Sequence, residues 1–345
     1  MKILQITPRY SPQSGGVETH VQQISERLVA RGHTVTVLTA DASLDGENRE
    51  RRNGVRIQRY RSLGKKESIH FCPQIGLAVR NADVDVVHAH NYHSLPVFFT
   101  ALAVADQRFI LTTHYHGESA DQTRDRLLSL YHPFGQWAVR KANHVVAVSN
   151  WEREQLELDF NIEPSVIPNG VDVDRFAKAE PEIRAQPYLL CVGRLEKYKG
   201  VQHLIQALPK LPTFELVVAG KGPYRDNLER IATEVGVSNR VTFLGYVDNG
   251  RLPELYAGAA VYITLSLFEA YGMTVGEALA AGTPCVVREA GALSEWTKNR
   301  GCVGVDDITS RTITDAVNTV VNREVTTTLP KWSEVTDQIL YCYER

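Results

Sequence analysis

The chain has 345 residues, a formal net charge of −2, 43% hydrophobic residues and 23% charged residues. This length suits two domains of ordinary size, and the composition is that of a globular protein. The small net charge argues against a dedicated nucleic-acid binder, which needs clustered Lys and Arg. No apolar run approaches the roughly 20 residues that span a bilayer, and the N-terminal apolar stretch is too short for a signal peptide.

The five cysteines are scattered along the chain and include no C-x-x-C pair. An odd number without metal-ligand spacing indicates reduced thiols rather than a disulfide framework or a metal cluster. We therefore expect a reducing, cytoplasmic setting.

Short β-branched runs alternate with helical patterns through the first half of the chain. Near-continuous apolar runs such as residues 145–148 are typical of parallel strands buried on both faces. Strands separated by helices indicate βαβ units and a doubly wound sheet. We predict strands at Lys2–Thr7, His33–Ala40, Gly54–Tyr60, Asp85–His90, Phe109–His114 and His144–Ser149, and helices at Val17–Arg31, Ser94–Ala105, Asp125–Lys141 and Trp151–Asp159.

Residues 49–66 are strongly basic within this first half. Two interpretations stay open: a solvated loop and strand edge, or a surface that contacts anionic lipid head groups or an acidic acceptor. The second would place the protein at the cytoplasmic face of a membrane. The basic side chains are those of Arg49, Arg51, Arg52, Arg56, Arg59, Arg61, Lys65 and Lys66, against the single acid Glu50.

Residues 170–187 are polar and contain prolines, which is typical of a linker. A helical spacing of apolar residues at 332–343 predicts a terminal helix that packs back on the first domain. The predicted fold is therefore α/β, with two doubly wound Rossmann-like domains at 1–178 and 179–329, and a terminal segment at 330–345. The second domain should contain strands at Tyr188–Gly193, Glu215–Gly220, Arg240–Tyr246, Ala260–Leu265, Pro284–Arg288 and Cys302–Val305.

Open α/β sheets bind ligands outside the carboxyl ends of their strands, so two such domains can hold two substrates across one cleft. After the first strand, Gly15 and Gly16 precede a helix whose free N–H groups suit a phosphate, although a plain helix start explains them equally well. The G-x-G-x-x-G fingerprint is absent. His114, at a predicted strand end, would point into the cleft from the acceptor side or be a structural histidine.

The second domain carries the most informative residues. Arg194 and Lys199 bracket the turn after its first strand, where a diphosphate would lie. Glu269 and Glu277 flank the start of a helix, and carboxylates can accept hydrogen bonds from sugar and ribose hydroxyls. The helix amides around Gly272 suit a phosphate.

Metal-binding patterns are weak. Asp83-Val84-Asp85 has a D-x-D form, but it precedes a strand and so lies at the amino edge of the sheet, and Asp172-Val173-Asp174 belongs to the linker. His88, His90 and His93 resemble a metal cluster without a nearby carboxylate. We expect no metal.

Gly15-Gly16-Val17-Glu18, the Gly-Arg-Leu-x-x-x-Lys-Gly motif at 193–200, Ala219–Pro223 and the Glu269 to Glu277 element together resemble retaining glycosyltransferases of the GT-B fold, family four. This family includes phosphatidylinositol mannosyltransferases, and the resemblance covers essentially the whole chain. It implies metal-independent transfer of a sugar from a nucleotide diphosphate with retention at the anomeric carbon.

The resemblance also implies residue roles. Arg194 and Lys199 would hold the diphosphate, Glu269 the donor sugar and Glu277 the ribose. Gly16 would lie near the phosphate or acceptor, and His114 near both sugar and acceptor. The expected site comprises catalytic Arg194, Lys199, Glu269 and His114; donor-binding Gly16, Gly193, Tyr246, Val247, Ala270, Tyr271, Gly272, Met273, Thr274 and Glu277; and acceptor-side Gly15, Glu18 and His114.

We expect a hexose-type sugar carried by UDP or GDP, and a lipid-linked, glycan or small-molecule acceptor. Two alternatives stay open: a nucleotide-sugar epimerase, which would need no acceptor, and a non-catalytic sugar-nucleotide-binding partner protein. Release of free nucleotide diphosphate in an acceptor screen separates these possibilities.

Overall fold

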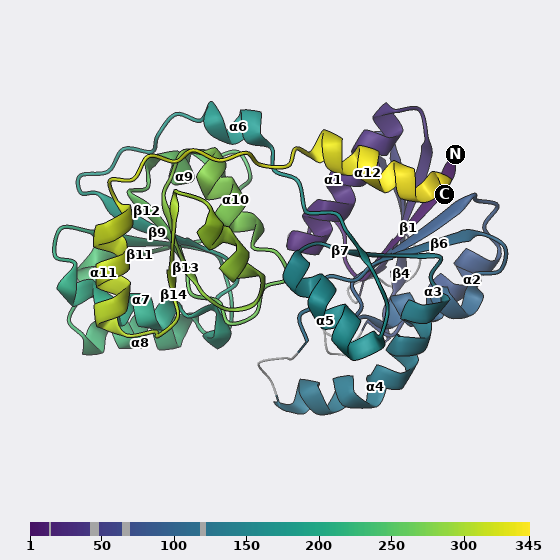
Figure 1. Ribbon diagram of the computed structural model, residues 1–345, viewed down its shortest axis with the longest axis horizontal. Helices are drawn as coiled ribbons and strands as arrows, with labels where there is room; N and C mark the ends of the chain where they lie inside the picture. Colours follow the sequence, from purple (N-terminus) through teal and green to yellow (C-terminus); the bar gives the residue numbers. More distant parts are fainter. Residues whose placement is uncertain (14, 42–47, 64–69, 118–121) are drawn as a thin grey trace. The chain divides into compact units, whose positions relative to one another are not determined.

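The computed structural model describes residues 1–13, 15–41, 48–63, 70–117 and 122–345 (Figure 1). The chain divides into two compact units. The first comprises Met1–Gly170 together with Trp332–Arg345, and the second comprises Val171–Lys331. The sequence places the boundary at 178 instead. It lies earlier in the structure because a short helix, α6 (Val173–Ala177), buries Phe176 in the core of the second unit.

An eight-stranded sheet forms the centre of the first unit. Its strand order is β3-β4-β2-β1-β5-β6-β7-β8, and the pairings are parallel except for β3 with β4. The predicted doubly wound sheet is therefore confirmed. The strands are β1 (Lys2–Thr7), β2 (Thr34–Asp41), β3 (Asn48–Arg52), β4 (Val55–Arg61), β5 (Val86–His90), β6 (Arg108–Thr112), β7 (His144–Ala147) and β8 (Ser165–Val166).

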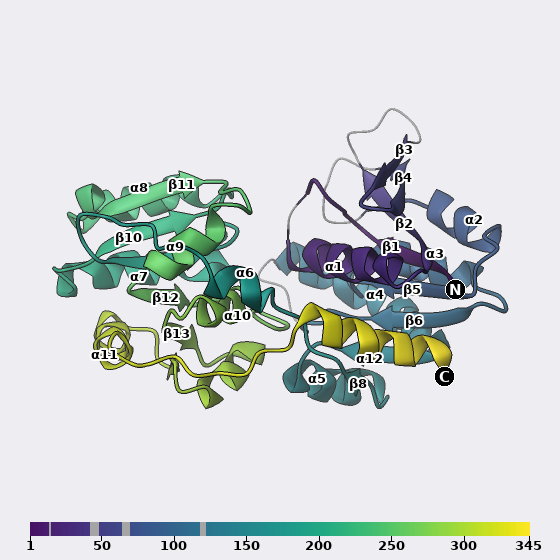
Figure 2. The same ribbon diagram turned by 90° about the horizontal axis from the view of Figure 1, so that it is seen from above.

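Helices cover both faces of this sheet (Figures 1 and 2). The buried apolar residues of α2 to α5 form one core with the inward side chains of the strands. The other face is covered by α1 and the C-terminal helix α12, which lie side by side in Figure 2. The helices of the unit are α1 (Gly16–Ala30), α2 (Gln74–Arg80), α3 (Leu95–Ala103), α4 (Gln122–Lys141), α5 (Asn150–Phe160) and α12 (Trp332–Glu344).

The helix α12 joins the first unit although it ends the chain. It buries Trp332, Val335, Ile339 and Tyr343, and each such side chain contributes about 1.5–3 kcal/mol on burial. The Tyr343 hydroxyl also accepts a hydrogen bond from Gln5 Nε2 at 2.9 Å. The predicted helix at 332–343 therefore packs on the first domain as expected.

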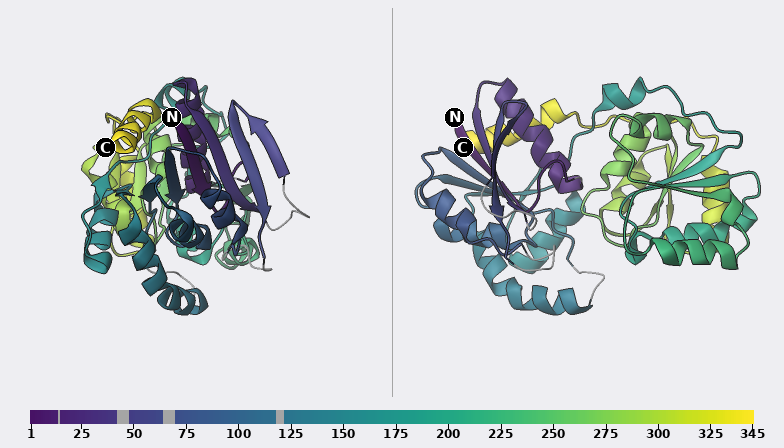
Figure 3. Two further views of the ribbon diagram at one scale, coloured as in Figure 1. Left: turned by 90° about the vertical axis from the view of Figure 1, so that its right-hand side faces the viewer. Right: turned by 180° about the vertical axis from the view of Figure 1, so that it is seen from behind.

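The second unit contains a six-stranded parallel sheet in the order β11-β10-β9-β12-β13-β14. One face packs against α7, α8 and α11, and the other against α6, α9, α10 and η4, as seen from two sides in Figures 1 and 3. The strands are β9 (Tyr188–Val192), β10 (Glu215–Ala219), β11 (Val241–Gly245), β12 (Val261–Thr264), β13 (Cys285–Arg288) and β14 (Cys302–Val305). The helices are α7 (Val201–Ala207), α8 (Arg225–Glu234), α9 (Leu252–Gly258), α10 (Met273–Ala280) and α11 (Ser310–Val320), with 3-10 turns η1 (Lys197–Lys199), η2 (Leu208–Lys210), η3 (Ser238–Arg240) and η4 (Gly291–Lys298).

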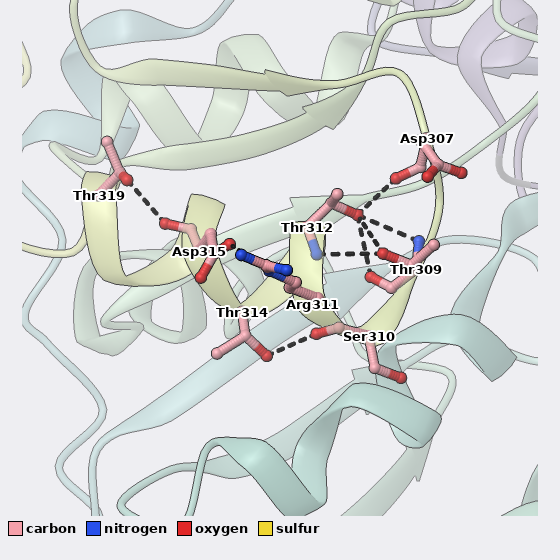
Figure 4. A network of polar contacts seen from close by, with 8 residues as sticks. All are labelled: Asp307, Thr309, Ser310, Arg311, Thr312, Thr314, Asp315 and Thr319. Atoms are coloured by element: carbon pink, nitrogen blue, oxygen red, sulfur yellow. Dashed lines mark hydrogen bonds and ion pairs between the residues drawn. The ribbon is translucent and has the colours of Figure 1, made fainter.

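The start of α11 shows how the sequence encodes a helix boundary (Figure 4). Thr309 caps the helix: its Oγ1 accepts a hydrogen bond from the Thr312 amide at 3.2 Å, and the Thr312 hydroxyl lies 3.1 Å from the Thr309 amide. This reciprocal pair satisfies two amides that would otherwise lack a partner. Ile313 and Val317 then face the core at helical spacing.

Several predicted boundaries were wrong. The strand expected at 109–114 ends at Thr112, and the strand expected at 144–149 ends at Ala147. The second shortening has a clear cause, because Ser149 is the cap of α5 and accepts a hydrogen bond from the Glu152 amide. The sequence also missed β3, β8, α2 and α6, which are short or strongly polar.

All five cysteines are free and buried. Across the described ranges, no helix combines the length and the apolar character needed to cross a membrane.

Candidate active site

In the second unit, the loops after β9 and β10 pack against each other without room for side chains. The Gly193 amide donates to the Ala219 carbonyl at 2.9 Å, and the Leu195 amide donates to Lys221 at 3.0 Å. Gly220 has φ of 142°, and a Cβ there would lie 1.8 Å from the Gly193 carbonyl oxygen. Only glycine fits this close approach. The packing fixes the backbone from which Arg194 projects.

A small cavity lies at the carboxyl end of β9. Gly193, Arg194, Lys199 and Glu269 line it together with Thr264. Lys199 Nζ donates a hydrogen bond to Glu269 Oε1, in a contact that is partly buried. Three of the four expected catalytic residues, Arg194, Lys199 and Glu269, are therefore brought together by the fold.

The electrostatics of the cavity follow from its ion pair. Burial lowers the pKa of Lys199, but the nearby Glu269 carboxylate outweighs it, and the net pKa lies above its ordinary value. Lys199 is thus firmly cationic. Arg194 is largely exposed, and its guanidinium donates to Glu196 at 2.9 Å. The cavity carries two cations, each already beside a carboxylate.

Glu277 lies within α10 and is partly buried. The Tyr256 hydroxyl donates to its Oε2 at 3.0 Å. Desolvation raises the pKa of Glu277 to about 7, although the Tyr256 hydrogen bond acts in the opposite direction. The contact of Glu277 with ribose stays a prediction.

The turn before α10 is held by its neighbours. Gly272 adopts φ of 89°, where a Cβ would also contact Leu293 at 2.8 Å. The Trp296 indole donates to the Tyr271 carbonyl at 2.6 Å, and the Tyr262 hydroxyl donates to Thr274 at 2.6 Å. The segment of Ala270, Tyr271, Gly272, Met273 and Thr274 is thereby fixed between η4 and β12, with the α10 amides at its end.

Tyr246 and Val247 directly follow β11. The Gly245 carbonyl accepts from the Gly220 amide at 2.7 Å, which continues the backbone pairing beyond the strand ends. The Tyr246 side chain is 55% exposed. The expected donor-binding residues Tyr246 and Val247 therefore follow the strand whose end pairs with Gly220, the residue that packs against Gly193.

In the first unit, Gly15 and Gly16 start α1 as predicted. An ion pair between half-buried Arg9 and buried Glu18 covers this helix end, with Arg9 Nε 2.8 Å from Glu18 Oε1. A Cβ on Gly15 would lie 2.3 Å from Glu18 Oε2, so the carboxylate folds back over the helix start. The Glu18 carboxylate thus lies at the N-terminal end of α1, where the helix dipole stabilises a negative charge. Its contact with the acceptor stays a prediction.

His114 does not end a strand, contrary to the sequence prediction. It lies two residues beyond β6, is 7% exposed, and adopts φ of 45°, an uncommon conformation for a residue other than glycine. Burial and two neighbouring histidines, His20 and His88, lower its pKa well below the ordinary value. The imidazole is therefore neutral.

Glu152 supports the His114 segment, and the sequence reasoning missed it. Its Oε1 accepts from the Thr113 hydroxyl at 2.5 Å and from the Tyr115 amide, and its Oε2 accepts from the Val148 amide at 2.6 Å. Burial raises its pKa to about 7 in spite of these donors. A glutamate three residues after a helix-capping serine is the available sequence signal. Its carboxylate holds both neighbours of His114.

The basic stretch is only partly a basic surface. Arg59 is buried and paired with Glu50 at 2.6 Å, so its inclusion in an exposed patch was wrong. Lys65 and Lys66 lie outside the described residues. The remaining arginines are exposed on β3, β4 and the end of β4: Arg49, Arg51, Arg52, Arg56 and Arg61.

The D-x-D element at 83–85 lies just before β5, where the sequence placed it, whereas Asp172 and Asp174 lie at the start of the helix α6 and not in a linker. Asp83 pairs with Lys2 at 2.6 Å, and Asp85 Oδ2 accepts from the Lys2 amide at 2.7 Å, just before β5. Asp174 lies in α6 and pairs with Lys331 at 3.5 Å. The element at 83–85 therefore lies at the amino end of β5.

The two sheets and the cationic cavity are the features of a GT-B glycosyltransferase that acts on nucleotide sugars. Residues 14–175 match the sequence family described as Glycosyltransferase Family 4, and residues 172–331 match Glycosyl transferases group 1. The chain therefore belongs to the glycosyltransferases that these two models describe, family 4.

Individual relatives agree with this assignment. The chain is 31% identical to the glycogen synthase of Mycobacterium tuberculosis over 88% of this chain and 82% of that protein. It is 29% identical to the phosphatidyl-myo-inositol mannosyltransferase of Mycobacterium leprae over 100% and 96%. Among solved structures, Anabaena HepE in complex with UDP and glucose superimposes with a TM-score of 0.79 at 18% identity, covering 100% of this chain and 99% of that one. The likeness to the last shows the shared fold.

Proposed function

We propose that this chain is a retaining glycosyltransferase that holds the donor diphosphate without a metal ion. The donor is a hexose-type sugar on UDP or GDP, and the acceptor is a lipid-linked, glycan or small-molecule hydroxyl. The relatives support a hexose donor, since one is named a mannosyltransferase, and the Anabaena structure contains UDP and glucose. The observation that carries the proposal is the cavity lined by Arg194, Lys199 and Glu269.

The chemistry needs stabilisation of the leaving group. When the bond from the anomeric carbon to the diphosphate oxygen breaks, its electron pair stays on the diphosphate. In this proposal Arg194 and Lys199, which line the cavity, stabilise that charge together with the amides at the start of α10. These fixed cations take the place of the Mg²⁺ ion that stabilises the leaving diphosphate in metal-dependent transferases.

Retention follows if the acceptor oxygen attacks from the face that the diphosphate leaves. The acceptor proton then passes to the departing diphosphate, so no enzyme base is required. Glu269 accepts hydrogen bonds from the sugar hydroxyls and forms no covalent bond in this mechanism, because the acceptor oxygen itself attacks the anomeric carbon. Glu277 would accept the hydrogen bonds of the ribose hydroxyls.

We propose that the donor binds the second unit and the acceptor binds the first, near Gly15, Gly16 and His114. The exposed arginines of β3 and β4 supply a positive surface for an anionic membrane or an acidic acceptor. A cytoplasmic location, peripheral at the membrane face, accords with five unpaired thiols.

The test begins with donors. A thermal-shift screen with UDP-, GDP- and ADP-sugars should reveal one nucleotide that stabilises the protein, by about 2.7 kcal/mol at 100 times its Kd. Acceptor screening with that donor should then release nucleotide diphosphate, and proton NMR of the product should show the donor's anomeric configuration. An inverted product contradicts retention. Sugar isomerisation without an acceptor contradicts the transferase itself.

A further inference from the structure

Three histidines meet in the interior of the first unit. His20 comes from α1, His90 is the last residue of β5, and His114 follows β6. His20 and His90 are completely buried, and His114 nearly so. One ring nitrogen from each lies within 4.8 Å of the other two. The cluster differs from the one the sequence suggested, since His88 and His93 are not members.

Each of the three rings has one nitrogen without a hydrogen-bond partner. These nitrogens are Nε2 of His20, Nδ1 of His90 and Nε2 of His114, all fully buried. A buried polar atom without a partner costs about 1–3 kcal/mol. Three in one place are unusual in a native interior and indicate that something is bound among them.

The opposite nitrogens of two of these rings are held by amide side chains. His20 Nδ1 lies 2.6 Å from Asn169 Oδ1, and His90 Nε2 lies 2.7 Å from Gln5 Oε1. The orientation of the Gln5 amide is fixed in turn, because its Nε2 donates a hydrogen bond to the Tyr343 hydroxyl. Since an amide oxygen only accepts, the protons sit on those two nitrogens. The lone pairs of His20 Nε2 and His90 Nδ1 are therefore free, which is the arrangement of metal-binding histidines.

We propose that His20, His90 and His114 together bind one divalent transition-metal ion, with zinc the natural choice for three imidazoles. Zn–N distances of about 2.0–2.1 Å require the three nitrogens to approach about 3.4 Å from one another, a shift of about 1 Å for each ring. Water or hydroxide takes the fourth position, and hydroxide offsets the charge that three neutral ligands leave.

The protonation states agree with this site. Burial lowers the pKa of His20 to about 4 and those of His90 and His114 well below their ordinary value. All three rings are neutral at pH 7, which is the form that binds metal. The site lies in the first unit, whereas the proposed diphosphate ligands lie in the second, so failure of the diphosphate assignment leaves this proposal intact. His114 is shared with the proposed acceptor side, so the metal is tested by binding and not by turnover.

The ion is tested with untagged protein, stripped by a chelator and titrated with Co²⁺. We expect one equivalent to bind with the visible absorption of a four-coordinate site, and Zn²⁺ to displace it. Asn169→Ala should weaken binding about 10–100-fold, as for other lost outer-shell partners, and His20→Ala or His90→Ala should weaken it further.

His88→Ala is the matched control. His88 is equally buried and its ring lies 4.1 Å from that of His90, but both its nitrogens are bonded, at 2.7 Å to Tyr343 and 2.8 Å to Thr112. It should bind Co²⁺ like the unsubstituted protein. If a variant does not fold, anomalous scattering from crystals of the unsubstituted protein soaked in Zn²⁺ decides. A peak among the three nitrogens supports the proposal; a bound water there, or metal only elsewhere, overturns it.

Discussion

Lys199 and Glu269 lie 70 residues apart in the sequence and form a hydrogen-bonded ion pair at the edge of the second sheet. The pair has a consequence for donor binding. A diphosphate that takes Lys199 must compete with a carboxylate already there, and a sugar that takes Glu269 must compete with an ammonium. Donor binding is thus an exchange of partners. The phosphate replaces Glu269 as the partner of Lys199, and the sugar hydroxyls replace Lys199 as the partner of Glu269.

This exchange predicts an asymmetric effect of Glu269→Gln. Removing the negative charge should leave the affinity for the free nucleoside diphosphate unchanged or increase it, because Lys199 loses its competitor. Transfer should fall at least ~100-fold in kcat/KM, because the sugar loses its acceptor. Calorimetry and steady-state kinetics measure the two effects. Glu229→Gln on the surface of α8 makes the same charge change and should alter neither. Loss of diphosphate affinity in Glu269→Gln would contradict the exchange.

The cations themselves give the second prediction. Arg194→Ala and Lys199→Ala should each lower kcat/KM at least ~100-fold, the scale of a lost preorganised stabiliser. The matched control is Lys197→Ala, an exposed lysine in the same turn. Circular dichroism should show intact folding in all three. Near-normal turnover in both Arg194→Ala and Lys199→Ala removes the basis of the diphosphate assignment.

Chelation tests how the diphosphate is held. We expect turnover to survive dialysis against EDTA, because side-chain cations and helix amides surround the proposed phosphate position. Activity that disappears and returns with Mg²⁺ contradicts this. Mg²⁺ is the informative ion, since it prefers oxygen ligands and is a poor match for three imidazoles. Recovery with Zn²⁺ alone would point instead to the histidine cluster.

The raised pKa of Glu277, about 7, predicts pH-dependent donor binding. Ribose hydroxyls donate, so they favour the carboxylate over the protonated acid. Nucleotide affinity should therefore fall as pH drops below about 7, by up to tenfold per unit. Comparison with Glu277→Gln between pH 6 and 8 isolates the effect, because titration of the nucleotide phosphate is common to both proteins. Equal pH slopes in the two proteins would exclude Glu277 as the titrating group.

Much of the fold was predictable from the sequence, because buried parallel strands produce apolar runs that are easy to recognise. The strands at Lys2–Thr7 and Cys302–Val305 were predicted with their observed bounds. The element β3 (Asn48–Arg52) was missed because it carries four charged residues in five and pairs only at the sheet edge. Nothing in its side chains marks a strand.

The candidate site was predictable only where a motif carried it. The motifs at Arg194 to Lys199 and at Glu269 led to residues that line one cavity, whereas Glu277 is not among the lining residues. Glu152 had a local signal, since it lies three residues after the capping Ser149, but its contacts with Thr113 and Tyr115 come from a distant segment. The histidine cluster could not be found this way, because its members come from distant segments that only the fold brings together. His20, His90 and His114 illustrate this, since α1, β5 and β6 are separated in sequence and adjacent in space.

The final prediction is that the two units divide the substrates. Arg194, Lys199 and Glu277 lie in the second unit, whereas His114 lies in the first, on a segment that Glu152 holds in place. Glu277→Ala should therefore weaken binding of the nucleoside diphosphate measured without acceptor. His114→Ala should leave that binding intact while lowering transfer, because we propose that His114 lies near the acceptor and the reacting sugar.

Calorimetry with the nucleoside diphosphate on both variants, followed by initial rates with donor and acceptor, decides between the assignments. Glu152→Gln extends the test, since an amide cannot accept at every oxygen position that the carboxylate serves, and the Val148 amide would face a competing donor. This variant should behave like His114→Ala, with nucleotide affinity retained and transfer reduced. If His114→Ala lost nucleotide affinity and Glu277→Ala kept it, the roles of the two units would be reversed.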